Sequence, residues 1–153
     1  MKKLIFPVTF LLVSGLYAFA DGNSGIIEGL IRQCENNLGT RITINSTGTR
    51  TIRRQAELMA NMTSRQLDMY GSSTWYVVEM KSSTLTGSGR VDEFERLIRD
   101  ARSRGSFVSR HLSGDAVDIA PSTQQVRNWL LGNGISIKDE TEDGILCWHL
   151  ELR

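Results

Sequence analysis

The chain has 153 residues, 40% of them hydrophobic, which is enough for one compact domain and too few for two ordinary ones. Its 18 basic and 17 acidic side chains nearly balance, so the sequence lacks the basic footprint that nucleic acid or an anionic membrane surface requires. We expect no nucleic-acid partner, and we expect a monomer.

The N-terminus has the pattern of an export signal. Two lysines precede an apolar run over 4–19, and a small-x-small cleavage site ends at Ala20. The run is too short for a stable membrane span, so we predict a signal peptide over 1–20 and no span after its cleavage. An uncleaved N-terminal anchor is the alternative. The short, di-lysine start is typical of bacteria, and we expect a periplasmic or secreted domain over 21–153.

Hydrophobic periodicity indicates helices in some segments and strands in others. In chain order, the predicted elements are a helix over 24–38, a strand over 41–45, a helix over 52–69, a strand over 74–80, a helix over 91–104, a strand over 116–120, a helix over 122–131, and strands over 135–138 and 144–152. This irregular order favours the α+β class, with a small, mostly antiparallel central sheet and flanking helices.

Polar and glycine residues set the predicted boundaries. Ser24 is the expected N-cap of the first helix, which ends at Gly39, and Ser122 is the expected N-cap of the last helix. The Ser-, Thr- and Gly-rich stretch 81–90 is predicted to be the most flexible loop.

Two cysteines, Cys34 and Cys147, leave two alternatives open. In an exported protein they could form a disulfide between the first helix and the last strand. They could equally be two buried free thiols, because free cysteine is often a small core residue. Neither belongs to a Cys-x-x-Cys pair, so redox or cysteine–zinc chemistry is not indicated.

The chain contains only two histidines, His111 and His149. A catalytic zinc site needs three ligands drawn from imidazole, thiolate or carboxylate groups, and a fourth position open for water. Asp118 supplies a carboxylate shortly after His111, and Gly114 lets the backbone turn tightly between them. Ala116 is small and leaves room beside a metal. We therefore expect Zn²⁺ to be bound by the two histidines and Asp118.

The segment from Ser109 to Asp118 resembles the Ser-x-His-x-x-Gly-x-Ala-x-Asp signature of the zinc D-alanyl-D-alanine peptidases, and every fixed position is present. That group includes the vancomycin-resistance carboxypeptidases and dipeptidases, phage L-alanyl-D-glutamate endopeptidases and, by fold, the hedgehog signalling domain. Its second histidine ligand lies on a late strand, commonly after tryptophan, as in Trp148-His149. The resemblance implies a hedgehog/DD-peptidase-like fold, metal ligation by His111, Asp118 and His149, and substrate binding by Ser109.

An upstream segment, 47–55, resembles the Ser-Gly-Tyr-Arg-Ser…Gln segment of the same family. Arg50 takes the place of the family's arginine, which stabilises the developing oxyanion as a fixed positive charge. Gln55 matches the glutamine and is a predicted substrate-binding residue. Thr49 replaces the usual tyrosine, so an aromatic wall of the cleft is missing there. The alternative for Arg50 is a solvated arginine on a helix face.

The sequence departs from the family at the general base. Many members carry an acid three residues before the second histidine, where this chain has Leu146. Glu151, Asp143 and its neighbour Glu142 are candidate replacements. Glu151 shares the face of His149 on a regular strand, and Asp143 lies close to where hedgehog-type domains place an acid. Glu151 and Asp143 are the predicted catalytic carboxylates, and a solvated surface carboxylate is the alternative for each.

The resemblance implies a zinc-dependent peptidase that acts on D-alanine-containing peptidoglycan stem peptides, as a carboxypeptidase or an endopeptidase. The export signal agrees, because this substrate lies outside the inner membrane. Leu146 favours the alternative of a degenerate zinc-binding module that binds the cell wall without turnover. A toxin or phage-derived wall hydrolase would share the chemistry and differ in biology.

Overall fold

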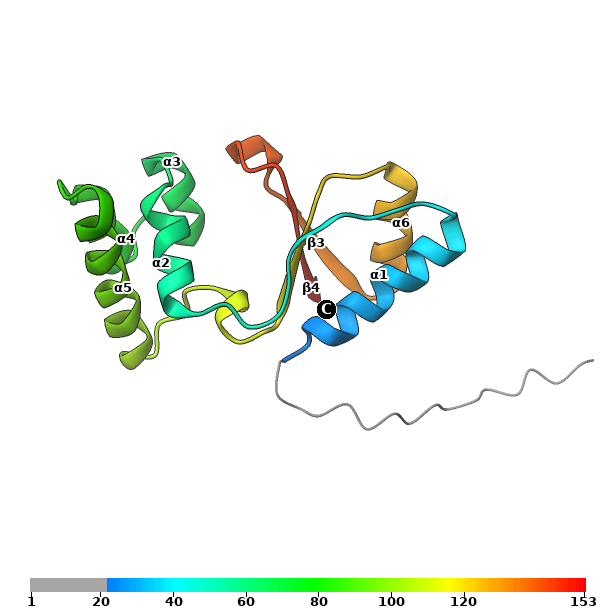
Figure 1. Cartoon of the computed structure of the whole chain (residues 1–153), viewed down its shortest axis with the longest axis horizontal. Coiled ribbons are helices and arrows are strands. Elements are labelled where there is room, and N and C mark those ends of the chain that lie inside the picture. Colours follow the sequence, from blue (N-terminus) through cyan, green and yellow to red (C-terminus); the bar gives the residue numbers. More distant parts are fainter. Residues whose placement is uncertain (1–21) are drawn as a thin grey trace, which may run out of the picture.

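The computed structural model describes residues 22–153, so the predicted signal peptide over 1–20 lies outside the described residues. Within this range a four-stranded antiparallel sheet, in the order β1-β2-β4-β3, is combined with six α-helices (Figure 1). The strands are β1 (Ile44–Ser46), β2 (Ala116–Ile119), β3 (Ile135–Asp139) and β4 (Trp148–Leu152). The helices are α1 (Ser24–Leu38), α2 (Ile52–Ala60), α3 (Ser64–Leu67), α4 (Trp75–Ser82), α5 (Gly87–Ser103) and α6 (Gln124–Gly132). The predicted α+β class and antiparallel sheet are confirmed.

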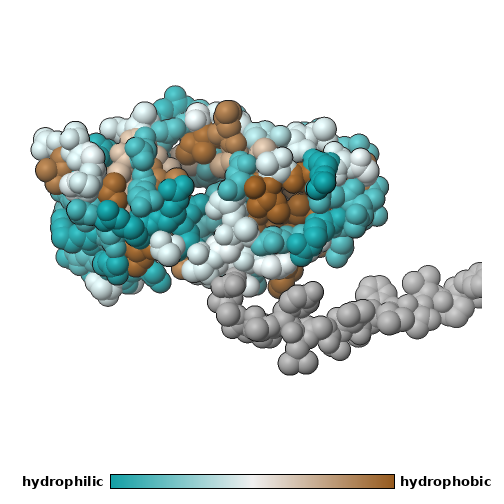
Figure 2. Space-filling model, viewed as in Figure 1, coloured by the Kyte–Doolittle hydropathy of each residue, from teal (hydrophilic) through white to brown (hydrophobic). Residues whose placement is uncertain are grey.

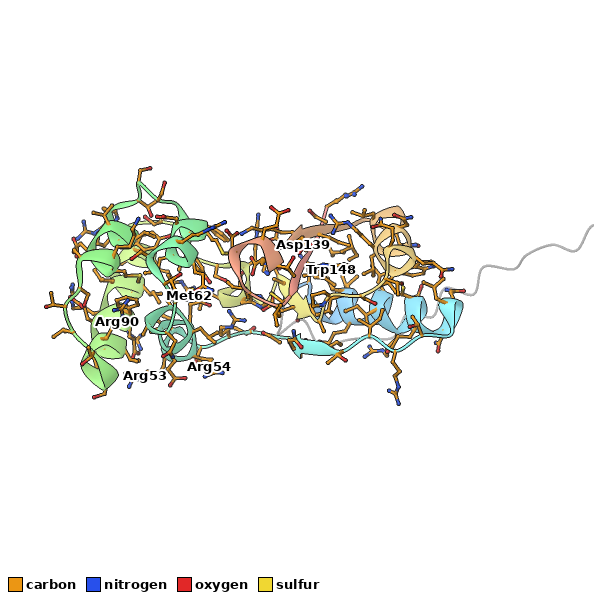
Figure 3. The ribbon with its side chains drawn as sticks, turned by 90° about the horizontal axis from the view of Figure 1, so that it is seen from above. Arg53, Arg54, Met62, Arg90, Asp139 and Trp148 are labelled. Carbon is orange, nitrogen blue, oxygen red and sulfur yellow. The ribbon has the colours of Figure 1, made fainter. Side chains whose placement is uncertain are left out.

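One face of the sheet packs against α1 and α6. Alternate residues of β2 and β4 point toward these helices and are buried with them: Val117, Ile119, Trp148 and Leu150. Trp148 is therefore a core residue, as predicted, and its indole Nε1 donates a hydrogen bond to Asp139 at 3.1 Å (Figure 3). Because side chains alternate along a strand, Asp118 and His149 project from the opposite face.

A second hydrophobic cluster is formed by α2, α4 and α5, which lie beyond that opposite face (Figure 1). Its fully buried side chains include Met59, Val77, Met80, Phe94 and Leu97. The 3₁₀ turns η1 (Asp68–Tyr70) and η2 (Arg110–Leu112) lie close to this cluster in the sequence, and η3 (Thr141–Asp143) joins β3 to β4. The polar face of the sheet and the helical cluster thus form two walls that face each other.

The predicted strand over 74–80 is wrong, because this segment forms the helix α4. β-branched and aromatic residues favour strands only when a half-buried sheet position is available to them. Here Tyr76, Val77 and Met80 are buried on one side at helical spacing, and the Tyr76 hydroxyl donates to the backbone carbonyls of Tyr70 and Phe107. Packing against α5 overrides the intrinsic preference of these residues.

The predicted helix over 52–69 is interrupted. α2 ends at Ala60, and Thr63 starts a new helix with a capping box in which its hydroxyl accepts from the Gln66 amide and Gln66 reaches back to the Thr63 amide. The second half of the predicted loop over 81–90 is helical, because α5 begins at Gly87.

Two predicted caps are displaced by one residue. Asn23 is the N-cap of α1 where Ser24 was expected, and Thr123 caps α6 where Ser122 was expected, through its hydroxyl and the Val126 amide. Gly39 ends α1, as predicted, and it adopts the left-handed conformation. The strand predicted over 41–45 is observed over 44–46, and the strand predicted over 144–152 is observed over 148–152, so both are shorter than predicted.

Cys34 and Cys147 are both buried free thiols in the structure, so the second of the two alternatives holds. Cys34 belongs to the core between α1 and the sheet, whereas Cys147 directly precedes β4. Among the residues described, no helix is long and apolar enough to cross a membrane.

Candidate metal centre

Three potential ligand atoms converge on the polar face of the sheet. Nε2 of His111 lies 3.0 Å from Oδ1 of Asp118, and Nδ1 of His149 lies 2.9 Å from the same oxygen. The two imidazole nitrogens are 3.2 Å apart. Within residues 22–153, this is the group of histidine, cysteine and acidic side chains whose ligand atoms lie close enough together to hold a metal ion.

These separations fit a tetrahedral cation. Zinc ligands lie about 2.0–2.2 Å from the ion, so two of them subtend about 3.3 Å in a tetrahedral site. The three side chains would supply three ligands to such a cation and leave the fourth position to water or substrate. The donor set, two imidazoles and one carboxylate, suits Zn²⁺ and other divalent transition metals. The structure therefore brings together the three predicted ligands in a group that could hold a metal ion.

Strand register aligns the site. Asp118 on β2 pairs with His149 on β4, and His149 pairs on its other side with Lys138 on β3. Ser46 on β1 pairs with Asp118. Side chains at paired positions share one face of an antiparallel sheet. A row of polar side chains consequently crosses all four strands, with two of the ligands at its centre.

A turn delivers the third ligand. His111 lies in η2, where the Ser109 hydroxyl accepts a hydrogen bond from the His111 amide, and its side chain is only 3% exposed. Gly114 follows with φ of 75°, a left-handed conformation that other residues rarely adopt. The chain can then return to β2, and buried Ala116 precedes Asp118 on the same face of the strand.

The two imidazoles have different outer contacts. Nε2 of His149 lies 3.0 Å from Oε1 of Glu151. When Nε2 donates to this carboxylate and the proton on Nδ1 is displaced, Nδ1 has a lone pair for a metal. Glu151 is held in turn by Arg110, whose Nε lies 3.4 Å from Oε2. Nδ1 of His111 is buried and has no hydrogen-bond partner among the described residues. Glu151 therefore orients one ligand, and no comparable carboxylate orients the other.

Arg50 supports the aspartate ligand. Its Nη2 lies 3.2 Å from Oδ2 of Asp118 and 2.9 Å from the Ser46 hydroxyl, and its Nη1 donates to Oε1 of Gln55 at 2.8 Å. The guanidinium carries more N–H donors than these three contacts use. The Arg50 amide also donates to the His111 carbonyl at 2.8 Å, which ties the loop before α2 to η2. Arg50 is not a solvated helix residue, since its side chain is 11% exposed.

Electrostatics favour an ionised Asp118. Burial alone would raise the pKa of its carboxyl group, but hydrogen bonds from His111 and His149 outweigh burial and hold the pKa well below its usual range. For His149 burial would lower the pKa, and the contacts with Asp118 and Glu151 raise it above its ordinary value. A carboxylate that stays charged at neutral pH is the form that binds a cation.

The ligands open onto a cavity of about 690 Å³ between the two walls. Figure 2 shows the molecule hollowed between its helical part and its sheet part. The cavity lining combines charged and apolar side chains from both walls, among them Arg54, Met62, Tyr70, Phe107, Lys138 and Leu146. Met62 and Arg54 lie at the end of the helical part that faces the sheet (Figure 3). This volume accommodates a short peptide.

The other predicted site residues are placed as follows. Ser109 and Glu151 line the cavity beside the ligands. Gln55 is fully buried behind Arg50, where its amide also donates to the Tyr70 hydroxyl at 3.1 Å. Asp143 is not among the cavity-lining residues, and its Oδ1 lies 3.8 Å from Nε of Arg65. The roles predicted for these residues stay predictions.

Polar cavity residues that were not anticipated from the sequence include Glu140, Lys138 and Tyr70. Nζ of Lys138 lies 3.2 Å from Oε1 of Glu140, and the Cys147 thiol donates to Oε2 of Glu140 at 3.4 Å. Burial raises the pKa of Tyr70 and of the Cys147 thiol, so both stay protonated at neutral pH. The available signal was that Glu140 lies two residues beyond Lys138, the end of the predicted strand over 135–138. This spacing indicates a shared face only if the strand continues, and it does not identify the partner strand.

Comparisons of the chain with protein-family models, with curated proteins and with solved structures gave no significant match. Its fold and site define an α+β domain with a His-Asp-His group at a cleft.

Proposed function

We propose that this protein is an exported, zinc-dependent peptidase of the hedgehog/DD-peptidase fold that cleaves peptidoglycan stem peptides containing D-alanine. The observation that carries the proposal is the convergence of His111 and Asp118 with His149, which lies 31 residues after Asp118, at the wall of a peptide-sized cavity. The resemblance of the segments 109–118, 148–149 and 47–55 to the zinc D-alanyl-D-alanine peptidases supports the choice of substrate.

In this proposal the chain's own residues bind, orient and stabilise. A zinc ion held by the three ligands would polarise the substrate carbonyl and lower the pKa of a bound water to about 7. Arg50, held by Gln55 and Ser46, would direct an unused N–H toward the oxygen that becomes negative in the transition state. Phe107 and Leu146, which are exposed at the cavity, would contact apolar parts of the peptide.

One observation favours a second candidate, a metal-binding module that binds the cell wall without turnover. Leu146, at the position of the family's usual base, is 77% exposed and cannot accept a proton. Figure 2 shows an apolar patch over the turn between η3 and β4, where this residue lies. Such a surface suits binding as well as catalysis.

Hydrolysis of defined fragments separates the two candidates. Purified protein lacking residues 1–20 is incubated with stem peptides ending in D-Ala-D-Ala and with crosslinked muropeptides, with and without added Zn²⁺, and products are identified by mass spectrometry. The peptidase proposal expects zinc-dependent cleavage that is lost in His111→Ala. Peptidoglycan binding without cleavage supports the binding module. Equal, intact fragments with wild type and His111→Ala would refute the peptidase.

A further inference from the structure

Glu140 lies diagonally across from His149 in the β3–β4 hairpin. Lys138 pairs with His149, and the Glu140 amide donates to the Cys147 carbonyl at 3.2 Å, which continues the pairing by one step beyond the strands. Lys138, Glu140, Cys147 and His149 therefore share the polar face of the sheet. Diagonal neighbours in an antiparallel pair lie about 7–8 Å apart at Cα and closer at Cβ, within the reach of a glutamate side chain.

Contacts on both sides hold the Glu140 carboxylate at the cavity wall. The Lys138 ammonium lies 3.2 Å from one oxygen, and the Cys147 thiol donates to the other at 3.4 Å. The Glu140 side chain is only 14% exposed, although it lines the cavity. Glu140 is absent from the group whose ligand atoms lie within 4.8 Å of one another, so it stands outside direct ligation. A base that takes a proton from a water next to the metal must line the cavity without binding the metal itself.

The carboxylates predicted from the sequence are less suited to this task. Glu151 contacts the imidazole of His149, one of the predicted ligands, and is held in that position by Arg110. Asp143 contacts Arg65 and is not among the residues that line the cavity. Glu142 is likewise absent from that lining. Of the acidic groups at the cavity, Glu140 is the one that neither ligates nor orients a ligand in the described structure.

We propose that Glu140 is the catalytic base of this site, an inference that rests on the proposed peptidase function. The carboxylate of Glu140 takes one proton from the attacking water as the water oxygen bonds to the carbonyl carbon of the scissile peptide. Glu140 then gives that proton to the amide nitrogen as the C–N bond breaks, which leaves a carboxylic acid and an amine. The lysine ammonium at 3.2 Å aligns the carboxylate during both transfers.

The test compares Glu140→Gln with Glu79→Gln, a matched control on the exposed side of α4 and outside the cavity lining. Glutamine keeps the size of the side chain and cannot take up a proton. Two readouts are recorded: hydrolysis of the stem peptides, and Co²⁺ binding followed by the pH dependence of the Co²⁺ visible spectrum. Retained Co²⁺ affinity in Glu140→Gln shows that the fold and the ligands are intact. Glu140→Asp, which keeps the acid but shortens its reach, is the second variant.

The proposal expects Glu140→Gln to lose about 100-fold to 10,000-fold in turnover at unchanged Co²⁺ affinity, with Glu140→Asp intermediate and Glu79→Gln like wild type. It also expects the pH midpoint of the Co²⁺ spectrum to move down in Glu140→Gln alone, because a nearby carboxylate favours the more positive state of the centre. Wild-type turnover in Glu140→Gln, or an unmoved midpoint, would overturn the proposal.

The two proposals fail in different ways. If wild type cleaves no fragment, the peptidase function is refuted, and the spectral midpoint alone then decides whether Glu140 faces water beside the metal. If wild type cleaves and Glu151→Gln, with normal Co²⁺ affinity, is the variant that loses turnover, the function stands and Glu140 is not the base.

Discussion

A contact with His149 decides between a catalytic and a positioning role for Glu151. Strand parity predicts that it shares the face of His149, and the structure places its Oε1 3.0 Å from the histidine Nε2. A carboxylate in that position raises the basicity of the ligand and fixes its tautomer. This contact makes Glu151 a positioning residue in our account, in contrast to the catalytic role that the sequence suggests.

Glu151→Gln should therefore weaken metal binding about 10-fold to 100-fold, because glutamine provides no negative charge opposite the Nε2 proton. Competition with a chelator measures the affinity for Zn²⁺, and Glu79→Gln is the matched control. If affinity is unchanged and only turnover falls, Glu151 acts as a base and not through His149.

Local patterns reveal the ligands but not the neighbours across the sheet. The signature around His111 and Asp118, together with scarce histidines, made the three ligands predictable. Glu140 could not be found in this way, because its proximity to His149 depends on the pairing of β3 with β4 and on their register. Register is set by the packing of a whole face and by the connecting turn.

At the level of elements, α4 shows how packing decides between helix and strand. Residues 74–80 are rich in residues that favour strands, yet they do not belong to the sheet. Their buried side chains have helical spacing and pack in the cluster that contains α5. Segments whose spacing and propensity agree, such as 24–38 and 91–104, were predicted as helices correctly. The misplaced segment is the one in which these two signals conflict.

Val78 tests the helix directly, because its side chain is 51% exposed and its amide donates to the Thr74 carbonyl at 3.0 Å. Val78→Ala should raise the free energy of unfolding by about 0.5 kcal/mol, since alanine has the higher helix propensity, whereas Val78→Pro should lower it by about 3 kcal/mol. Urea denaturation measures both. A destabilising Val78→Ala would indicate that the segment behaves as a strand.

The turn after β3 carries a pH-dependent contribution through Asp139. Hydrogen bonds from Thr141 lower the pKa of this carboxyl, burial opposes them, and further contacts with Trp148 and Arg127 add to the lowering. A carboxyl whose pKa is lower in the folded state contributes stability above its unfolded pKa of about 3.9. That contribution is lost as the pH falls through the lower, folded pKa.

The difference in unfolding free energy between wild type and Asp139→Asn should accordingly be largest near neutral pH and shrink below about pH 4. The side chain is partly exposed, so solvent screening limits the difference to about 1 kcal/mol or less. Denaturation at a series of pH values measures it. A difference that stays constant from pH 7 to pH 2 would contradict the assignment of this turn to the charged carboxylate.

On the scale of the whole molecule, the cavity lies between two parts of the chain, each of which has its own hydrophobic cluster. One cluster joins α1 and α6 to the sheet, and the other joins α2, α4 and α5. The order of elements was sufficient to predict the α+β class. The position of the helical cluster opposite the polar face was not predictable, because it depends on long-range contacts that no local periodicity encodes.

The three ligands come from η2, β2 and β4, so a bound cation would connect the η2–β2 segment to the last strand. Anything that binds the folded state alone stabilises it by mass action. With free Zn²⁺ at about 100 times the dissociation constant, unfolding should require about 2.7 kcal/mol more than in the metal-free protein. His111→Ala should not show this gain.

The most direct test of the metal centre is zinc-edge X-ray absorption on the purified protein, combined with the zinc content per chain. We predict one zinc per chain, with nitrogen and oxygen ligands at about 2.0–2.2 Å including two imidazoles, and loss of this zinc in His111→Ala and His149→Ala. Wild type that retains no more zinc than these two variants would contradict it.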